Sequence, residues 1–220
     1  MNFKEQALIL YKKVFCEDSE EFAQNFTDRY FDKCCRYIIS GGKLVSMLYL
    51  LDCSIFDGEK TYSAKYLYAA ATHPDYQHKG LMSNLIKSAL AEEKNIVTKP
   101  ATRELFSFYE KFGFKVCSYS TGFNVCVDER FKVSDKEYIY YRNMLLENTP
   151  HITLEDMDFA LAGIELYAND NFCAAFDRQE QKVKEYISKD KEKLLGDIPF
   201  AMWTVENPIC NRVYFGMAMD

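Results

Sequence analysis

The chain has 220 residues, 48% of them hydrophobic, and a formal net charge of −6. This length and composition suffice for one large domain with its own core. The acidic balance argues against a nucleic-acid or anionic-membrane binder, because no broad basic surface can be assembled. No run approaches the roughly 18 apolar residues of a membrane-spanning helix.

The cysteines and histidines indicate neither disulfides nor a metal site. Eight cysteines are scattered through apolar segments, without a CxxC pair or a secretory leader. We therefore expect reduced thiols in a cytoplasmic protein. The histidines, His73, His78 and His151, form no zinc-binding pattern with the cysteines, so we expect no metal.

The first part of the chain predicts two helices followed by strands. Apolar residues recur at helical spacing in 4–15 and 19–31, and Ser19 suits the N-cap of the second helix. The period then changes to that of strands, and Gly-Gly and Asp-Gly turns join them as an antiparallel set, at 36–40, 44–53 and 61–72.

The rest of the chain alternates helices with strands. After the third strand we predict, in order, helix 80–93, strand 96–98, helix 103–112 and strand 115–127. The strands on either side of the first of these helices are expected to be parallel. Beyond residue 130 the pattern predicts helices at 137–146, 154–166 and 179–195, and strands at 172–176, 200–205 and 212–219.

A short basic loop with a glycine lies directly before the helix 80–93. It reads QHKGLM over residues 77–82 and places consecutive backbone N–H groups at the positive end of a helix. Gly80 allows the backbone to approach a phosphate without an intervening Cβ. A single glycine also fits an ordinary strand–helix turn.

The segments before and after this loop point to a known protein family. The small-residue strand LYAAATHP leads into QHKGLM, which matches the pattern Q/R-x-x-G-x-G/A, and FYEKFGF follows at 108–114. Together they resemble the GNAT superfamily of N-acetyltransferases over residues 36–127. The resemblance implies an α/β fold with a mixed, largely antiparallel sheet flanked by helices, followed here by a C-terminal α+β extension. It divides the chain into an acetyl-CoA-binding core, 1–130, and the extension, 131–220, which we expect to pack on and complete the same domain.

The resemblance also implies roles for particular residues. The backbone of Ala70, Ala71 and Thr72 would pair with the pantetheine arm of acetyl-CoA, and an N–H near Ala71 would meet the oxyanion. Tyr109 would be the general acid at the thioester sulfur. The pyrophosphate would be bound by backbone N–H groups of His78, Lys79, Gly80, Leu81, Met82 and Ser83.

The sequence departs from the family pattern at two positions. Met82 replaces a glycine or alanine, and Thr102 replaces an asparagine often found seven residues before the tyrosine. Tyr109 also has a structural interpretation, because it shares a buried helix face with Leu105, Phe108 and Phe112. Cofactor binding is therefore the better supported half of the prediction.

A general base is harder to assign. No carboxylate lies in 62–72, so the candidates are Asp52, Glu104 and the C-terminal carboxylate of Asp220. In relatives of the enhanced-intracellular-survival type that terminal carboxylate is implied to reach the active site. We therefore hypothesise that the apolar segment 213–220 lies beside 115–127 and delivers it, although a terminal strand that only completes the sheet is the favoured interpretation of the pattern.

The sequence thus predicts a cytoplasmic acetyltransferase that uses acetyl-CoA as cosubstrate and no metal. Transfer to a small-molecule or peptide amine would be direct, because no cysteine has a histidine partner motif. Nucleic acid and membrane are not expected partners. The alternatives are a non-catalytic acyl-CoA-binding or regulatory module, and an acyltransferase that uses another acyl-CoA donor.

Overall fold

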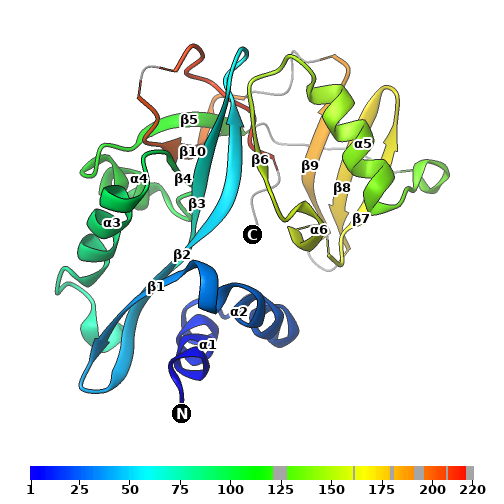
Figure 1. The fold of residues 1–220 in the computed structure, drawn as a ribbon. Coiled ribbons are helices and arrows are strands. Elements are labelled where there is room, and N and C mark those ends of the chain that lie inside the picture. Colours follow the sequence, from blue (N-terminus) through cyan, green and yellow to red (C-terminus); the bar gives the residue numbers. More distant parts are fainter. Residues whose placement is uncertain (121–127, 161, 179–180, 191–195, 207, 217–220) are drawn as a thin grey trace.

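The computed structural model describes residues 1–120, 128–160, 162–178, 181–190, 196–206 and 208–216 (Figure 1). Its first part contains α1 Phe3–Val14, α2 Glu20–Cys34, β1 Cys35–Ser40, β2 Lys43–Phe56, β3 Thr61–Thr72, η1 Pro74–Tyr76, α3 Leu81–Glu92, β4 Ile96–Thr98, α4 Arg103–Glu110 and β5 Lys115–Ser120. Its second part contains η2 Glu129–Phe131, α5 Asp135–Leu146, β6 His151–Leu154, α6 Met157–Ala160, β7 Glu165–Asn169, β8 Phe172–Asp177, β9 Lys182–Ser188 and β10 Ile198–Trp203.

The main sheet combines strands from both parts of the chain. Among the described residues its order is β1-β2-β3-β4-β10-β5, and β6 pairs with β2. The predicted antiparallel set β1–β2–β3 and the parallel pair β3–β4 are confirmed. Strand β10 lies between β4 and β5 and is antiparallel to both, so a late segment of the chain completes the early sheet. A second sheet, β7-β8-β9, carries α5 (Figure 1).

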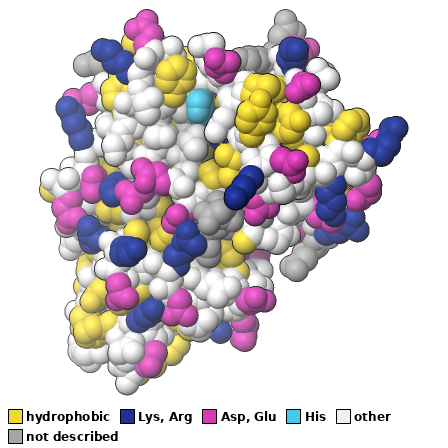
Figure 2. Space-filling model, turned by 45° about the vertical axis from the view of Figure 1, so that its right-hand side comes forward, with side chains coloured by type: hydrophobic (Ala, Val, Ile, Leu, Met, Phe, Trp, Pro, Cys, Tyr) yellow, Lys and Arg dark blue, Asp and Glu magenta, His cyan; other side chains and the backbone are white. Residues whose placement is uncertain are grey.

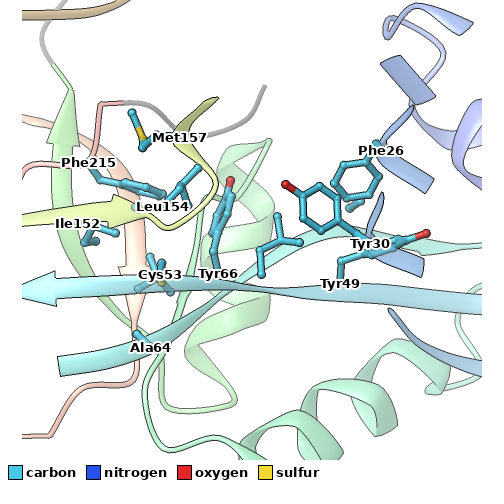
Figure 3. Close-up of a cluster of buried hydrophobic side chains, with 14 of the residues drawn as sticks. Phe26, Tyr30, Tyr49, Cys53, Ala64, Tyr66, Ile152, Leu154, Met157 and Phe215 are labelled. Atoms are coloured by element: carbon cyan, nitrogen blue, oxygen red, sulfur yellow. The ribbon is translucent and has the colours of Figure 1, made fainter. Parts of the chain in front are cut away.

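Alternating side chains of β2 supply two cores on opposite faces of the main sheet. Tyr49, Leu51 and Cys53 belong to a cluster with the helices α1 and α2. Leu48 and Leu50 belong to a cluster with α3 and α4. Figure 3 shows how the first cluster is built, with Phe26 and Tyr30 from α2 on one side and residues of the second half of the chain on the other, namely Ile152, Leu154, Met157 and Phe215.

Capping residues explain where the first helices begin. Ser19 accepts the N–H of Phe22 at 3.1 Å, which confirms the predicted N-cap of α2. Asn2 and Glu5 form a reciprocal capping box at α1. The predicted helix and strand positions up to residue 120 agree with the structure to within a few residues, and 121–127 lie outside the described residues.

Three predictions in the second half are wrong. The predicted helix 154–166 is the end of β6, the short α6 and the start of β7, because Ile152 and Leu154 alternate on a strand that pairs with β2. The predicted helix 179–195 contains β9, whose buried residues Glu185 and Ile187 follow a period of two. Of the predicted strand 212–219, the described part 212–216 forms only an isolated bridge, at Tyr214, and 217–219 lie outside the described residues.

A buried ion pair connects α5, β9 and the C-terminal segment. The Glu185 carboxylate accepts hydrogen bonds from Arg142 Nε at 3.0 Å and from the hydroxyls of Tyr138 and Tyr214 at 2.8 and 3.1 Å. All four residues are buried. Because each charge has a partner, the cluster can remain ionised inside the second half of the molecule.

Charged side chains of both signs are interspersed on the face drawn in Figure 2, without a large patch of one sign. No helix in the described part of the chain combines the length and apolarity needed to cross a membrane. Within those same residues, no group of three or more His, Cys, Asp or Glu side chains is arranged to hold a metal ion.

Candidate active site

The N-terminus of α3 has no side-chain cap. Its N-cap residue is Gly80, and the first helical hydrogen bond runs from the N–H of Asn84 to the Gly80 carbonyl at 3.0 Å. Within the described residues, the N–H groups of 78–83 have no acceptor. By contrast, α1, α2 and α5 begin at residues whose side chains accept a backbone N–H, namely Asn2, Ser19 and Ser134, whereas the Thr102 side chain at the start of α4 makes no such bond. The start of α3 is therefore equipped to bind an anion.

The loop before α3 is exposed and held in shape by its own contacts. Lys79 Nζ donates to the Asp75 carbonyl at 2.9 Å and lies 4.7 Å from the centre of the Tyr76 ring. His78 and Gly80 have φ angles of 59° and 76°. A Cβ at Gly80 would meet nothing within 4 Å, so the backbone conformation, and not lack of space, requires glycine there.

The end of β3 that leads into this loop has an open edge. Pairing with β4 ends where Leu67 faces Thr98. The N–H of His73 donates to the Val45 carbonyl at 2.8 Å, so His73 and Ala71 direct their backbone groups toward β2. Because these directions alternate along a strand, the backbone groups of Ala70 and Thr72 face the open edge, where the Thr72 carbonyl accepts a hydrogen bond from Gln77 Nε2 at 3.4 Å. An extended ligand can pair with that edge as an added strand.

A bulge bends β3 immediately before the open edge. Tyr68 pairs with Tyr49 and Ala71 with Met47, so two residues of β3 face one residue of β2. One of the two, Ala69, is buried and has a φ of 47°, which a non-glycine residue rarely adopts. The bulge redirects the strand at the point where β4 stops, and strain of this kind is concentrated at functional sites.

Tyr109 lies in the core between α4 and the sheet. It is 5% exposed, and its ring contacts those of Phe108 and Phe114 at centroid distances of 5.4 Å. Burial raises the pKa of Tyr109, and the neighbouring Thr98 side chain partly opposes this rise. Thr98 Oγ1 in turn donates to the Leu67 carbonyl, so the phenol lies next to the residue at which β4 parts from β3.

This arrangement can be compared with known proteins. The model of the acetyltransferase (GNAT) domain matches residues 2–117, more than half of the chain. The chain belongs to the GNAT acetyltransferase family. The match includes the open edge of β3, the uncapped start of α3 and Tyr109. A comparison with curated protein sequences gives no significant match.

Solved GNAT structures share the fold at low sequence identity. A GCN5-related N-acetyltransferase from Kribbella flavida is 11% identical, with a TM-score of 0.64 over 91% of this chain and 69% of that one. A second, from Anabaena variabilis, is 14% identical, with a TM-score of 0.60 over 86% and 57%. Eis1 from Mycobacterium abscessus is 10% identical, with a TM-score of 0.55 over 86% and 57%. The chain thus spans little more than half the length of the last two.

Two of the three candidates for the general base are poorly placed for that role. Asp52 lies away from the open edge of β3, and Glu104 is exposed to solvent. Asp52 forms an ion pair with Lys65, which precedes Ala70 by about 16 Å of strand. Asp52 also lines a cavity of about 380 Å³ at the edge of β2, together with Arg29, Arg36 and Asp156. This cavity contains none of the residues 78–83, whose backbone N–H groups form the cradle at the start of α3. Glu104 is exposed in the first turn of α4, where its own backbone N–H and Thr102 lower the pKa of its carboxyl.

The third base candidate, Asp220, lies outside the described residues. The segment leading to it does run beside β5, as the N–H of Val213 donates to the Cys117 carbonyl at 2.8 Å. On its other side, the N–H of Ile152 in β6 donates to the Tyr214 carbonyl at 2.8 Å. The segment 213–215 therefore fills the space between β5 and β6.

The structure adds one carboxylate that the sequence does not single out. Asp18, in the loop between α1 and α2, accepts a hydrogen bond from the Tyr11 hydroxyl at 2.6 Å. The Tyr11 hydroxyl also lies 3.3 Å from that of Tyr68, which precedes the bulge in β3. Only the seven-residue spacing of Tyr11 and Asp18 is visible in the sequence, whereas their contact with Tyr68 depends on the fold.

Proposed function

We propose that the protein transfers the acetyl group of acetyl-CoA directly to a primary amine. One observation carries this proposal. The open edge of β3 at Ala70 and Thr72 runs into the uncapped N-terminus of α3 with only the loop 73–80 between them. A ligand that fits both features combines an extended chain containing amides with a doubly charged anion at its end, and the pantetheine pyrophosphate of CoA has this form.

The chain's own groups would divide the binding between them. The N–H groups of residues 78–83 and the positive end of α3 would bind the pyrophosphate. The backbone groups of Ala70 and Thr72 would pair with the pantetheine amides. Because the N–H of Ala71 is directed toward β2, we assign contact with the carbonyl oxygen of the thioester to the N–H of Ala70.

Tyr109 would stabilise the leaving sulfur by donating a hydrogen bond. Full proton transfer from a tyrosine of pKa near 10 to a thiolate of pKa near 8.5 is uphill by about 2 kcal/mol in water. Burial raises the pKa of Tyr109 and makes its proton still harder to lose. The phenol therefore acts mainly as a hydrogen-bond donor until the sulfur leaves with its full charge.

The acceptor would be a small-molecule or peptide amine that approaches from the face of the sheet carrying Tyr66 and Tyr68. That face is rich in aromatic side chains, and the Tyr68 ring packs edge-on to Phe26 at a centroid distance of 5.2 Å. No covalent intermediate is needed, because the amine nitrogen can attack the thioester carbon directly.

Calorimetric titration with acetyl-CoA, CoA and succinyl-CoA tests the donor. We expect micromolar binding of acetyl-CoA, since the cradle and the open edge are both formed. Thiol release in the presence of spermidine, kanamycin or a lysine-containing peptide then tests transfer. Binding without turnover of any amine would support a non-catalytic CoA-binding module, and preferred turnover of succinyl-CoA would assign another donor.

A further inference from the structure

Three side chains form a hydrogen-bonded row from the α1–α2 loop to the bulge of β3. The Tyr11 hydroxyl donates to Asp18 Oδ2 at 2.6 Å. The Tyr68 hydroxyl lies 3.3 Å from the Tyr11 oxygen, which can accept its proton. Tyr68 is next to the strained residue Ala69 and two residues before Ala70, whose backbone faces the open edge. The row therefore connects the α1–α2 loop with the strand segment next to the open edge, with the Tyr68 side chain on the α1–α2 face of the sheet.

Packing fixes the two phenols, while the carboxylate is accessible to water. Tyr11 is fully buried, and its ring contacts that of Phe26 at a centroid distance of 5.4 Å. Tyr68 and Asp18 are half-buried. The titratable groups that face Asp18 are the phenols of Tyr11, from α1, and Tyr68, from β3. Among the described residues, no cationic side chain forms an ion pair with Asp18, and the Tyr11 hydroxyl is its hydrogen-bond partner.

From this row we infer that Asp18 is the proton acceptor of the transfer reaction, reached from the amine through Tyr68 and Tyr11. The inference rests on the acetyl transfer proposed above. It names a base that lies 44 residues before the segment 62–72, which contains no carboxylate. Tyr68 is then the residue that touches the amine, and Tyr11 and Asp18 act through it.

The proton transfer balances without another reactant. The amine enters in its neutral form, its ammonium proton already lost to water. Its nitrogen lone pair forms the N–C bond, and the carbonyl π pair moves to oxygen. The nitrogen then releases a proton to the Tyr68 oxygen, Tyr68 passes its own proton to Tyr11, and Tyr11 passes its proton to Asp18. The oxygen pair re-forms the C=O bond as the C–S bond breaks, and the thiolate, which accepts a hydrogen bond from Tyr109, takes its proton from water. Asp18, being half-buried, returns its proton to solvent.

The two phenols need not ionise in this scheme, because each gains a proton as it loses one. This agrees with their surroundings, since burial raises the pKa of both Tyr11 and Tyr68. A lone tyrosine at either position would be a poor base for the same reason. The row is effective only with a carboxylate at its far end.

The test uses Asp18→Asn and Tyr68→Phe, singly and together, with whichever of spermidine, kanamycin and the lysine peptide is acetylated. We expect each single variant to lose about 100-fold in kcat, as is common when a general base is removed. The double variant should lose no more than either single one, because the residues act as one unit. The kcat–pH profile of Asp18→Asn should differ in shape from that of the wild type, because the proton acceptor at the end of the row is gone.

Tyr30→Phe is the matched control. The Tyr30 hydroxyl donates to Asp156 Oδ2 at 3.0 Å, a bond of the same kind on α2 outside the row. This variant should keep the wild-type kcat and pH profile. Titration with acetyl-CoA should give the same Kd for Asp18→Asn as for the wild type, which separates a proton-transfer defect from misfolding.

Three results would overturn the inference. One is wild-type kcat with an unchanged kcat–pH profile in Asp18→Asn, and another is additive losses in the double variant. Both leave the proposed acetyl transfer intact. The third, binding of acetyl-CoA without acetylation of any amine by the wild type, would remove the proposed transfer and the relay together.

Discussion

The Arg142 guanidinium and the Glu185 carboxylate form an ion pair from which water is excluded, with side-chain exposures of 1% and 0% and an Nε–Oε2 distance of 3.0 Å. The pair joins α5 to β9, and the Tyr214 hydroxyl ties the segment before the C-terminus to the same carboxylate at 3.1 Å. It therefore couples the second sheet to a segment that also contacts β5 and β6.

Removing one partner should destabilise the protein strongly. We expect Glu185→Gln to lower the free energy of unfolding by about 3–5 kcal/mol, since the Arg142 charge would remain buried without compensation. Urea denaturation measures the loss. The exposed pair Lys4–Asp28 serves as control, and Lys4→Gln should cost no more than about 1 kcal/mol. Equal losses in the two variants would contradict this account.

Gly80→Ala should weaken acetyl-CoA binding by about tenfold, because a left-handed residue with a Cβ costs roughly 1–2 kcal/mol and the loop relaxes away from the cradle. Calorimetric titration measures the Kd. Gly163→Ala is the matched control, with a φ of 78° against 76° and equally no neighbour within 4 Å. The control should lose similar stability and keep the wild-type Kd. Equal weakening by both substitutions would show that strain alone, and not the cradle, is responsible.

Tyr109→Phe should reduce kcat by about 100-fold and leave the Kd for acetyl-CoA unchanged, since the ring and its packing are retained. Burial raises the pKa of Tyr109, so the phenol keeps its proton to more alkaline pH than an exposed tyrosine. Ionisation of Tyr109 should therefore not lower the wild-type kcat below about pH 10. Steady-state kinetics across pH test both statements, and a variant with the wild-type kcat would exclude Tyr109 from the reaction.

Asp57 should make stability sensitive to acid. Burial alone would raise the pKa of this carboxyl, but the N–H groups of Lys60 and Glu59 and the Tyr62 hydroxyl bind the charged form and lower the pKa to about 2. Its contribution, roughly 2 kcal/mol, is complete above the unfolded-state pKa near 3.9 and is lost as the pH falls toward 2. Unfolding of Asp57→Asn should therefore differ from the wild type at pH 7 and converge with it near pH 2.

The control for Asp57 is an exposed aspartate on α2. Asp32→Asn should leave the stability unchanged at both pH values, because this side chain lies at the surface. A constant difference between Asp57→Asn and the wild type from pH 7 to pH 2 would show that the turn, and not the charge, sets the effect.

Adding two residues after Asp220 separates the two carboxylates proposed as base. If Asp18 accepts the proton, the extended chain should keep the wild-type kcat, because the terminal carboxylate has no part in the transfer. Thiol release with the acetylated amine measures this. A loss of about 100-fold in the extended chain, together with a fully active Asp18→Asn, would assign the role to the C-terminus instead.

Local signals in the sequence predict the first half of the fold well. The strand 61–72 begins after an Asp-Gly turn and ends before Pro74, and the start of α3 is marked by Gly80. These signals involve neighbours in the chain, so they can be read without knowing the tertiary structure.

The errors arise where distant residues decide the structure. Glu185 lies at a core position of β9, where the sequence pattern leads one to expect an apolar residue. The charged side chain therefore indicates the polar face of a helix, because its partner Arg142 lies far away in the chain. The same limit applies to the site. The sequence predicts the glycine cradle and Tyr109, but the approach of Asp18 to Tyr68 depends on how α1 packs against β3.

The insertion of β10 between β4 and β5 has a consequence for biosynthesis. Both neighbours are translated well before β10, and at the usual 5–20 residues per second the ribosome needs on the order of ten seconds to reach Trp203 after β5. During that time the nascent chain presents two strand edges with no partner between them, and such edges readily pair with other chains. Chaperone protection of the growing polypeptide is most valuable to this protein in that interval.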